Sequence, residues 1–153
     1  MVKRPRAFSS YPRFHFLYVR AYRGAPLPGL NFAEGGQSST GSIIRWTKHL
    51  FGETDYAQLD IEAAKIIPGC DGLVALETFQ GSRTPVTDPL ARGALVGLTL
   101  KHTRAHIWRA FMEAVCFGTR ACVEGLAKAG HEADEIIIAG GTVRSPLWLQ
   151  MHA

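Results

Sequence analysis

The order of apolar and polar positions divides the chain into short candidate strands and two longer candidate helices. Apolar residues recur at helical spacing over 42–51 and along 103–128, where an apolar stripe runs beside a polar side. Shorter apolar runs at 73–76, 94–98 and 135–139 are typical of strands. Strands and helices are therefore both predicted along the chain.

The segment 103–128 is the longest predicted helix, and Gly130 follows it where a helix commonly ends. Gly118 stands in the middle of the apolar stripe, although glycine costs about 1 kcal/mol relative to alanine inside a helix. We therefore expect a neighbouring element to approach the helix closely at Gly118. The stripe consists of Ile107, Phe111, Ala114, Val115, Gly118, Cys122 and Leu126.

The most specific local pattern is a strand, a glycine turn and a helix start, in that order. The run Ile136–Ile138 favours a covered strand, and Gly140 and Gly141 allow a sharp turn and a close ligand contact. Ser145 followed by Pro146 predicts an N-cap and a first helical residue. Free N–H groups at such a turn can bind a nucleotide or a phosphate. A tight turn without a ligand, as in any α/β domain, is the alternative.

Three segments rich in glycine, proline and hydroxyl residues are predicted loops: 22–28, 34–41 and 81–89. The second of them leads directly into the predicted helix at 42–51, so it repeats the arrangement of a flexible loop before a helix start. Asp88 and Arg92 are four residues apart beside a proline turn. We interpret them as a pair that fixes the loop rather than as catalytic groups.

The basic charge of the chain is concentrated at its start. The whole chain carries a formal charge of +4, but residues 1–33 contain six basic residues and no acidic one. We interpret residues 1–20 as an unmatched basic leader, which is a transit segment, a nucleic-acid arm, a tail or a segment without function. The remaining chain is not basic, so its composition indicates no nucleic-acid partner.

The number and spacing of the cysteines and the length of the apolar runs bear on where the protein is located. Cys70, Cys116 and Cys122 form no C-x-x-C pair, and their odd number suits reduced, mostly buried thiols in a cytoplasmic protein. No apolar run approaches the roughly 18 residues that would span a membrane. His102 and His106 are spaced for one helix face, but without a metalloprotease pattern we predict no metal site there.

These motifs together resemble the FGGY family of carbohydrate kinases, which includes xylulokinase, ribulokinase and glycerol kinase. The second signature of the family matches two segments, 93–98 and 106–113, which are separated by seven residues. Phe111 departs from the signature, because a smaller residue is usual at its position. The resemblance covers about 24–153 and leaves 1–20 unmatched. Further motifs in the family order lie at 34–41, 81–85, 88–93 and 140–150.

The resemblance implies an actin-like (ribonuclease H-like) ATPase domain of the α/β class, truncated at both ends. Residues 21–153 would then form a partial C-terminal nucleotide-binding domain. In this family two domains close on a cleft, and the second domain holds most of the ATP. The first domain, which carries the catalytic Asp, has no counterpart in the matched segment, so we assign no catalytic residue and no metal ligand.

The resemblance also assigns five residues to the nucleotide. Gly41 would offer an N–H to the phosphates, Arg45 would contact the nucleotide one turn later, and Gly140 and Gly141 would let the adenosine lie against the backbone. Ser145 would contact the adenine or the ribose. A solvated helix residue is the alternative for Arg45, and a simple N-cap is the alternative for Ser145.

The expected function is therefore that of a fragment of an ATP-dependent carbohydrate kinase, which phosphorylates a sugar or polyol hydroxyl. The start of segment 34–41 favours a pentulose or a polyol. The complete enzyme would use ATP and Mg²⁺ and would bind ADP and its sugar, and a homodimer is the assembly that we expect of it. We expect the isolated chain to be inactive and to have no membrane or nucleic-acid partner. A non-catalytic remnant or interaction protein with the same fold is the alternative.

Glu113 lies within the signature, but its mid-helix position favours a structural role over that of a base.

Overall fold

The computed structural model describes residues 20–23, 28, 31–53 and 55–153. The predicted leader, apart from residue 20, and most of the predicted loop at 22–28 therefore lie outside the described residues. Residues 22 and 23 belong to a strand instead of that loop.

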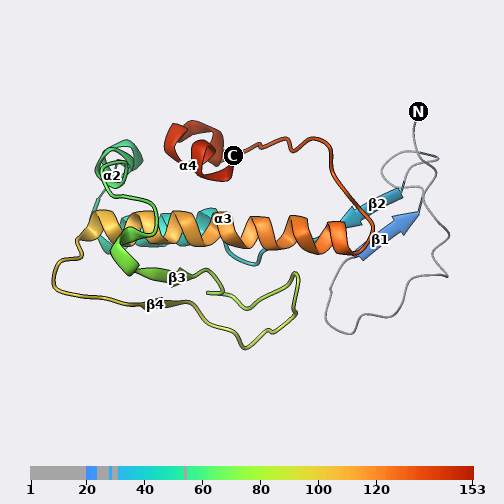
Figure 1. Ribbon diagram of the computed structural model, residues 1–153, viewed down its shortest axis with the longest axis horizontal. Coiled ribbons are helices and arrows are strands. Elements are labelled where there is room, and N and C mark those ends of the chain that lie inside the picture. Colours follow the sequence, from blue (N-terminus) through green and yellow to red (C-terminus); the bar gives the residue numbers. More distant parts are fainter. Residues whose placement is uncertain (1–19, 24–27, 29–30, 54) are drawn as a thin grey trace.

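The helix α3 (Arg104–Lys128) is the central element of the fold. The helices α1 (Gly41–Leu50), α2 (Tyr56–Ala63) and α4 (Pro146–His152) all contact it. In Figure 1, α2 and α4 lie along one side of α3, and the strands β3 (Val74–Leu76) and β4 (Ala94–Val96) lie along the opposite side. The predicted helices at 42–51 and 103–128, and the helix start at Pro146, are confirmed to within about a turn.

The strands form two separate antiparallel pairs among the described residues. The runs at 73–76 and 94–98 form the strands β3 and β4, as the sequence predicts, and the two strands pair with Val74 opposite Val96. The strands β1 (Arg20–Arg23) and β2 (Asn31–Glu34) form the other pair. Two short 3₁₀ turns, Cys70–Gly72 and Gly141–Arg144, precede β3 and α4 respectively.

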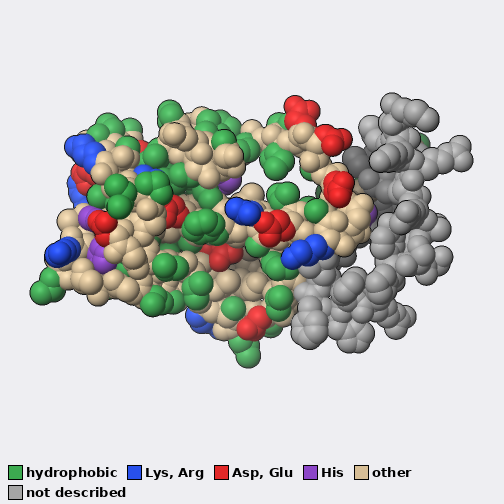
Figure 2. Space-filling model, viewed as in Figure 1, with side chains coloured by type: hydrophobic (Ala, Val, Ile, Leu, Met, Phe, Trp, Pro, Cys, Tyr) green, Lys and Arg blue, Asp and Glu red, His purple; other side chains and the backbone are tan. Residues whose placement is uncertain are grey.

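The predicted strand at 135–139 is wrong. This segment has no regular secondary structure, and Ile136 and Ile137 are 61% and 83% exposed. The segment runs as a loop from the end of α3 back to α4, and Figure 2 shows an opening between this loop and α3. Three β-branched residues favour an extended chain, but a strand needs a hydrogen-bonded neighbour, and the described part of the chain places none beside it.

The core lies around the first half of α3, where helix and strand side chains meet. Trp108, Phe111 and Met112 of α3 are each 1% exposed and pack against the faces of α1, α2 and β3. The ring of Phe111 also contacts that of Phe79, with centroids 5.5 Å apart. Gly93 is required beside this cluster, because a Cβ there would lie 2.1 Å from the Phe79 ring. Within the described ranges, no helix is long and apolar enough to cross a membrane.

The predicted close approach at Gly118 is confirmed. The side chain of Gln37, from the loop before α1, lies against α3 at this point, and a Cβ on Gly118 would be 2.1 Å from Gln37 Nε2. Gln37 Nε2 donates a hydrogen bond to the Val115 carbonyl oxygen at 3.0 Å, and Thr119 Oγ1 donates to Gln37 Oε1 at 2.9 Å. Gln37 therefore fastens the loop at 34–41 to α3.

Asp88 and Arg92 fix their loop separately rather than as a pair. Asp88 Oδ1 accepts a hydrogen bond from the N–H of Leu90 at 2.8 Å. Arg92 Nη1 donates to the carbonyl oxygens of Pro89 and Ala91 at 3.1 and 2.8 Å. The predicted structural role is supported, but the predicted contact between the two side chains is replaced by bonds to the backbone.

Candidate nucleotide-binding site

A cavity of about 750 Å³ lies where the starts of α1, α2 and α4 meet over α3. This volume is within the usual range of small-molecule sites, roughly 300–1,000 Å³. Its floor is apolar and includes Ile44, Trp108, Met112 and Trp148. Its rim carries polar groups from three segments that are far apart in the sequence.

Three of the five residues assigned to the nucleotide line this one cavity. Gly41 comes from the start of α1, and Gly141 and Ser145 come from the turn before α4. Arg45 and Gly140 do not line the cavity, and Arg45 is exposed on α1. The structure thus brings together the two loop-to-helix segments that the sequence analysis singled out.

The turn before α4 is shaped by its two glycines in different ways. Gly140 has φ +91°, which only glycine adopts without strain, so it sets the direction of the turn. A Cβ on Gly141 would have no atom within 4 Å, so the backbone there faces open space. Ser145 Oγ accepts the N–H of Trp148 at 3.1 Å, which confirms the predicted N-cap. A hydroxyl used in this way still has its own hydrogen to donate.

The start of α1 suits an anion. Thr40 at the N-cap position makes no side-chain cap, and the first turn contains no acidic residue. The first N–H groups of a helix lack a partner four residues back, and the helix dipole places partial positive charge there. In α1 the N–H of Ile43 donates to the Thr40 carbonyl oxygen at 3.0 Å, so the N–H groups of Gly41 and Ser42 are the open ones. Gly41 at this position adds no side chain between those N–H groups and the cavity.

Sequence reasoning missed the opposite wall of the cavity, which the helix α2 supplies. Asp55 is the N-cap of α2, since its Oδ1 accepts the N–H of Ala57 at 2.9 Å. Asp60 lies one turn further and accepts the indole N–H of Trp108 at 2.8 Å. The capping Asp55 was a readable signal for this helix. The bond between Asp60 and Trp108, 48 residues apart, had no local signal.

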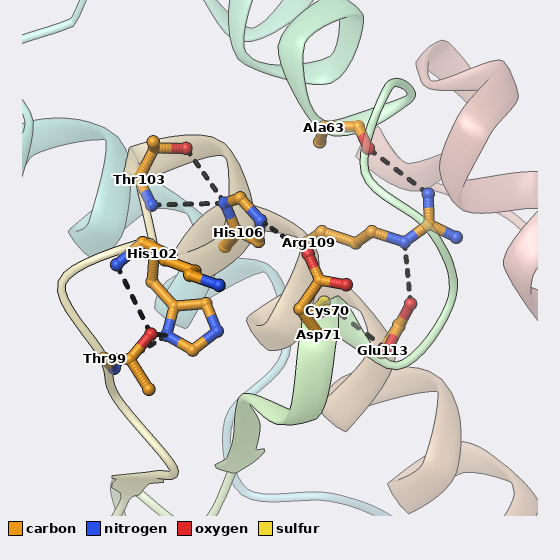
Figure 3. A network of polar contacts seen from close by, with 10 residues as sticks. Ala63, Cys70, Asp71, Thr99, His102, Thr103, His106, Arg109 and Glu113 are labelled. Atoms are coloured by element: carbon orange, nitrogen blue, oxygen red, sulfur yellow. Dashed lines mark hydrogen bonds and ion pairs between the residues drawn. The ribbon is translucent and has the colours of Figure 1, made fainter.

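Glu113 is not among the residues that line the cavity, and its contacts indicate a structural role. Figure 3 shows its carboxylate bonded to Arg109. Its carboxylate accepts the N–H of Gly69 at 3.1 Å and the Nε–H of Arg109 at 2.7 Å. Arg109 also donates to the carbonyl oxygen of Ala63 at 3.2 Å. This buried ion pair ties the end of α2 and the following turn to α3, which supports the structural interpretation of Glu113.

The side chains of the two histidines near the start of α3 accept hydrogen bonds from the backbone that leads into this helix (Figure 3). His106 Nδ1 accepts the N–H of Thr103 at 3.1 Å, and its Nε2 lies 3.2 Å from Asp71 Oδ2. His102 Nδ1 accepts the N–H of Thr99 at 2.9 Å. The described residues contain no group of three histidine, cysteine, aspartate or glutamate side chains that would hold a metal ion.

All three cysteines are free thiols, as the sequence predicts. Burial, together with the nearby Glu113 carboxylate, raises the pKa of the Cys70 thiol to about 12. Burial also raises the pKa of the Cys116 thiol to about 11. Because the thiolate is the nucleophile, the raised pKa values of Cys70 and Cys116 disfavour their reaction near neutral pH.

The fold and the cavity define the class of protein: the chain is part of an α/β domain of the actin-like ATPase type. The family description that matches is "FGGY family of carbohydrate kinases, C-terminal domain", over residues 11–153. The chain belongs to this family, so the resemblance read from the motifs is confirmed. The match begins inside the segment 1–20, for which the sequence alone predicts a leader.

Similar proteins place the chain within the family. A ribulokinase from Mycolicibacterium smegmatis is 36% identical over 142 residues, which cover 85% of this chain and 25% of the ribulokinase. A crystal structure of xylulose kinase from Rhodospirillum rubrum matches with TM-score 0.78 and 38% identity, over 90% of this chain and 28% of that one. A crystal structure of Plasmodium falciparum glycerol kinase with ADP shares the fold, with TM-score 0.68 and 23% identity. The match covers 80% of this chain and 24% of that one. The chain thus spans about a quarter of the length of these relatives.

Proposed function

We propose that the cavity between α1, α2 and α4 is the nucleotide site of an ATP-dependent carbohydrate kinase. The parent reaction is the phosphorylation of a sugar or polyol hydroxyl, with a pentulose or a polyol as the favoured acceptor. The observation that carries this proposal is that Gly41, Gly141 and Ser145 line one cavity although about 100 residues separate the first from the others. The family membership supports the choice of reaction.

In this proposal the phosphates lie at the start of α1 and the nucleoside lies against the turn before α4. The open N–H groups near Gly41 would face the phosphates. Gly141 would let the nucleoside approach the backbone, and the hydroxyl of Ser145 would donate to it. Gly140 acts by shaping the turn, and Arg45 would act from outside the lining, at the phosphate end.

The proposal assigns no catalytic residue to this chain. Phosphoryl transfer needs a base for the acceptor hydroxyl and several groups that neutralise the phosphates. Mg²⁺ would supply part of that neutralisation, and because the described residues contain no group of three metal-ligating side chains, we expect the phosphates to provide most of its ligands. The family resemblance locates the base in the other domain, so we expect no turnover from the chain alone.

Nucleotide binding tests the site directly. Few phosphate contacts are available from this chain, and the cleft is open to water. We therefore expect an ADP dissociation constant in the millimolar range, which corresponds to a binding free energy of about 4 kcal/mol. Gly141→Val should fold, because its Cβ meets no atom within 4 Å and its φ lies outside the left-handed region. The branched side chain would occupy the space of the nucleoside and lower the affinity at least tenfold.

Ligand-observed NMR with ADP measures this loss, and circular dichroism checks the fold. Ala133→Val is the matched control, because Ala133 is exposed and lies outside the cavity lining. Equal ADP affinity in a folded Gly141→Val protein would remove the glycine turn from the site. In a second assay, the chain with ATP, Mg²⁺ and a panel of pentuloses, hexuloses and polyols should give only background ADP. Sugar-dependent ADP formation would show that the chain carries a base of its own.

A further inference from the structure

The α2 wall of the cavity carries two carboxylates, and one of them is held in a fixed orientation. The buried indole of Trp108 donates to Asp60 Oδ1 at 2.8 Å. Asp60 is half-buried and lines the cavity. Its second oxygen has no hydrogen-bond partner among the described residues, so it is available to a ligand.

The charges of the cavity decide which end of a nucleotide this wall faces. Phosphates repel the carboxylates of Asp55 and Asp60, whereas the start of α1 attracts them. The nucleoside end must therefore face α2, where Tyr56 and Ile61 line the cavity and expose apolar surface to a flat base.

The two carboxylates differ in depth. Asp55 is exposed at the rim, and its Oδ1 is occupied by the N–H of Ala57. Asp60 is half-buried and lines the cavity between Tyr56 and Ile61, where the base would pack, so its free oxygen meets the base edge rather than the ribose. A carboxylate only accepts hydrogen bonds, so it selects a base that presents a donor at this edge.

We propose that Asp60, positioned by Trp108, accepts a hydrogen bond from the exocyclic amino group of the base and makes the cavity prefer adenine to hypoxanthine. This inference rests on the proposed function of the cavity as a nucleotide site. Adenine carries an amino donor at C6, whereas hypoxanthine carries a carbonyl acceptor there, which would face the carboxylate without a proton between them. ADP and inosine diphosphate share the ribose and the phosphates, so their comparison isolates this edge.

The substitution Asp60→Asn gives a sharp test, because Trp108 fixes which way the new amide points. The indole N–H is only a donor, so the amide oxygen turns toward it and the amide N–H₂ takes the place of the free oxygen. The position then donates instead of accepting. We expect the original chain to bind ADP at least about tenfold more tightly than inosine diphosphate, and Asp60→Asn to reverse this order.

Ligand-observed NMR titrations with both nucleotides measure the ratio, and tryptophan fluorescence confirms that each variant is folded. Asp55→Asn is the matched control and should keep the adenine preference. Asp60→Ala should bind both nucleotides alike. An unchanged preference in Asp60→Asn, or a reversal in Asp55→Asn, would overturn the proposal while leaving the nucleotide site intact. If neither nucleotide binds to any folded variant, the proposed function fails, and this proposal fails with it.

Discussion

Gly118 allows a quantitative test of how the loop at 34–41 is fastened to α3. The residue lies in the middle of a 25-residue helix, where alanine is intrinsically better by about 1 kcal/mol. A Cβ at this position would lie 2.1 Å from Gln37 Nε2 and 2.5 Å from Glu77 Oε1. Both atoms are the ends of flexible side chains, so Gly118→Ala displaces them rather than the backbone.

The energetic cost is then that of the lost hydrogen bonds. Gln37 bonds to the Val115 carbonyl oxygen and to Thr119 Oγ1, and each bond contributes about 1 kcal/mol. Their loss, about 2 kcal/mol, exceeds the helix-propensity gain of about 1 kcal/mol. Gly118→Ala should therefore destabilise the chain by about 1 kcal/mol, which lowers the melting temperature by about 2–4 °C.

The sign should reverse when Gln37 is removed first. In a Gln37→Ala background no amide occupies the space beside α3, so Gly118→Ala should stabilise the chain by about 1 kcal/mol. Urea denaturation of the four proteins forms a double-mutant cycle with a coupling of about 2 kcal/mol. If Gly118→Ala stabilises the original chain as much as the Gln37→Ala protein, the loop is not fastened through this contact.

Two further predictions concern ionisable groups. The hydrogen bond from Arg104 lowers the pKa of Glu62 from 4.5 to about 2, so this pair should contribute to stability above pH 4.5 and lose its contribution as the pH falls toward 2. Arg104→Gln should raise the pKa of Glu62 toward 4.5 in an NMR titration, and an unmoved pKa would contradict the assigned cause. The thiols of Cys70 and Cys116, with pKa values of about 12 and 11, should resist iodoacetamide at pH 8 until urea unfolds the chain. Rapid labelling of the folded chain would show that these thiols are open to solvent.

The elements that the sequence predicts correctly are those whose signals are local. Helix α3 has a long apolar stripe and a glycine end, and α4 has the serine and proline of a helix start. The segment at 135–139 fails because its apolar run indicates a strand, while a strand is defined by a neighbour that no run of residues specifies. Helix α2 was missed because it buries only Leu59 and Ala63 and is eight residues long.

The residues of the candidate site also fall into two groups, those with a local signal in the sequence and those without one. Gly41, Gly141 and Ser145 are visible in the sequence, because backbone N–H groups at a helix start need glycine and a capping hydroxyl nearby. The acidic wall is not visible, because Asp60 belongs to a short helix and owes its orientation to Trp108, which follows it by 48 residues. Side chains that act through tertiary contacts are found only once the helices are packed.

Both halves of the cavity depend on α3, and this explains how a chain of this length can build it. Gln37 holds the loop that ends at Gly41, and Trp108 holds Asp60 on the facing wall. Neither contact involves a residue outside 31–153. Binding a nucleoside needs only a shaped surface with a few fixed polar groups, whereas phosphoryl transfer also needs a base and charge neutralisation. Nucleoside recognition and catalysis should therefore separate in this protein: the cavity should discriminate between bases even where the chain transfers no phosphate.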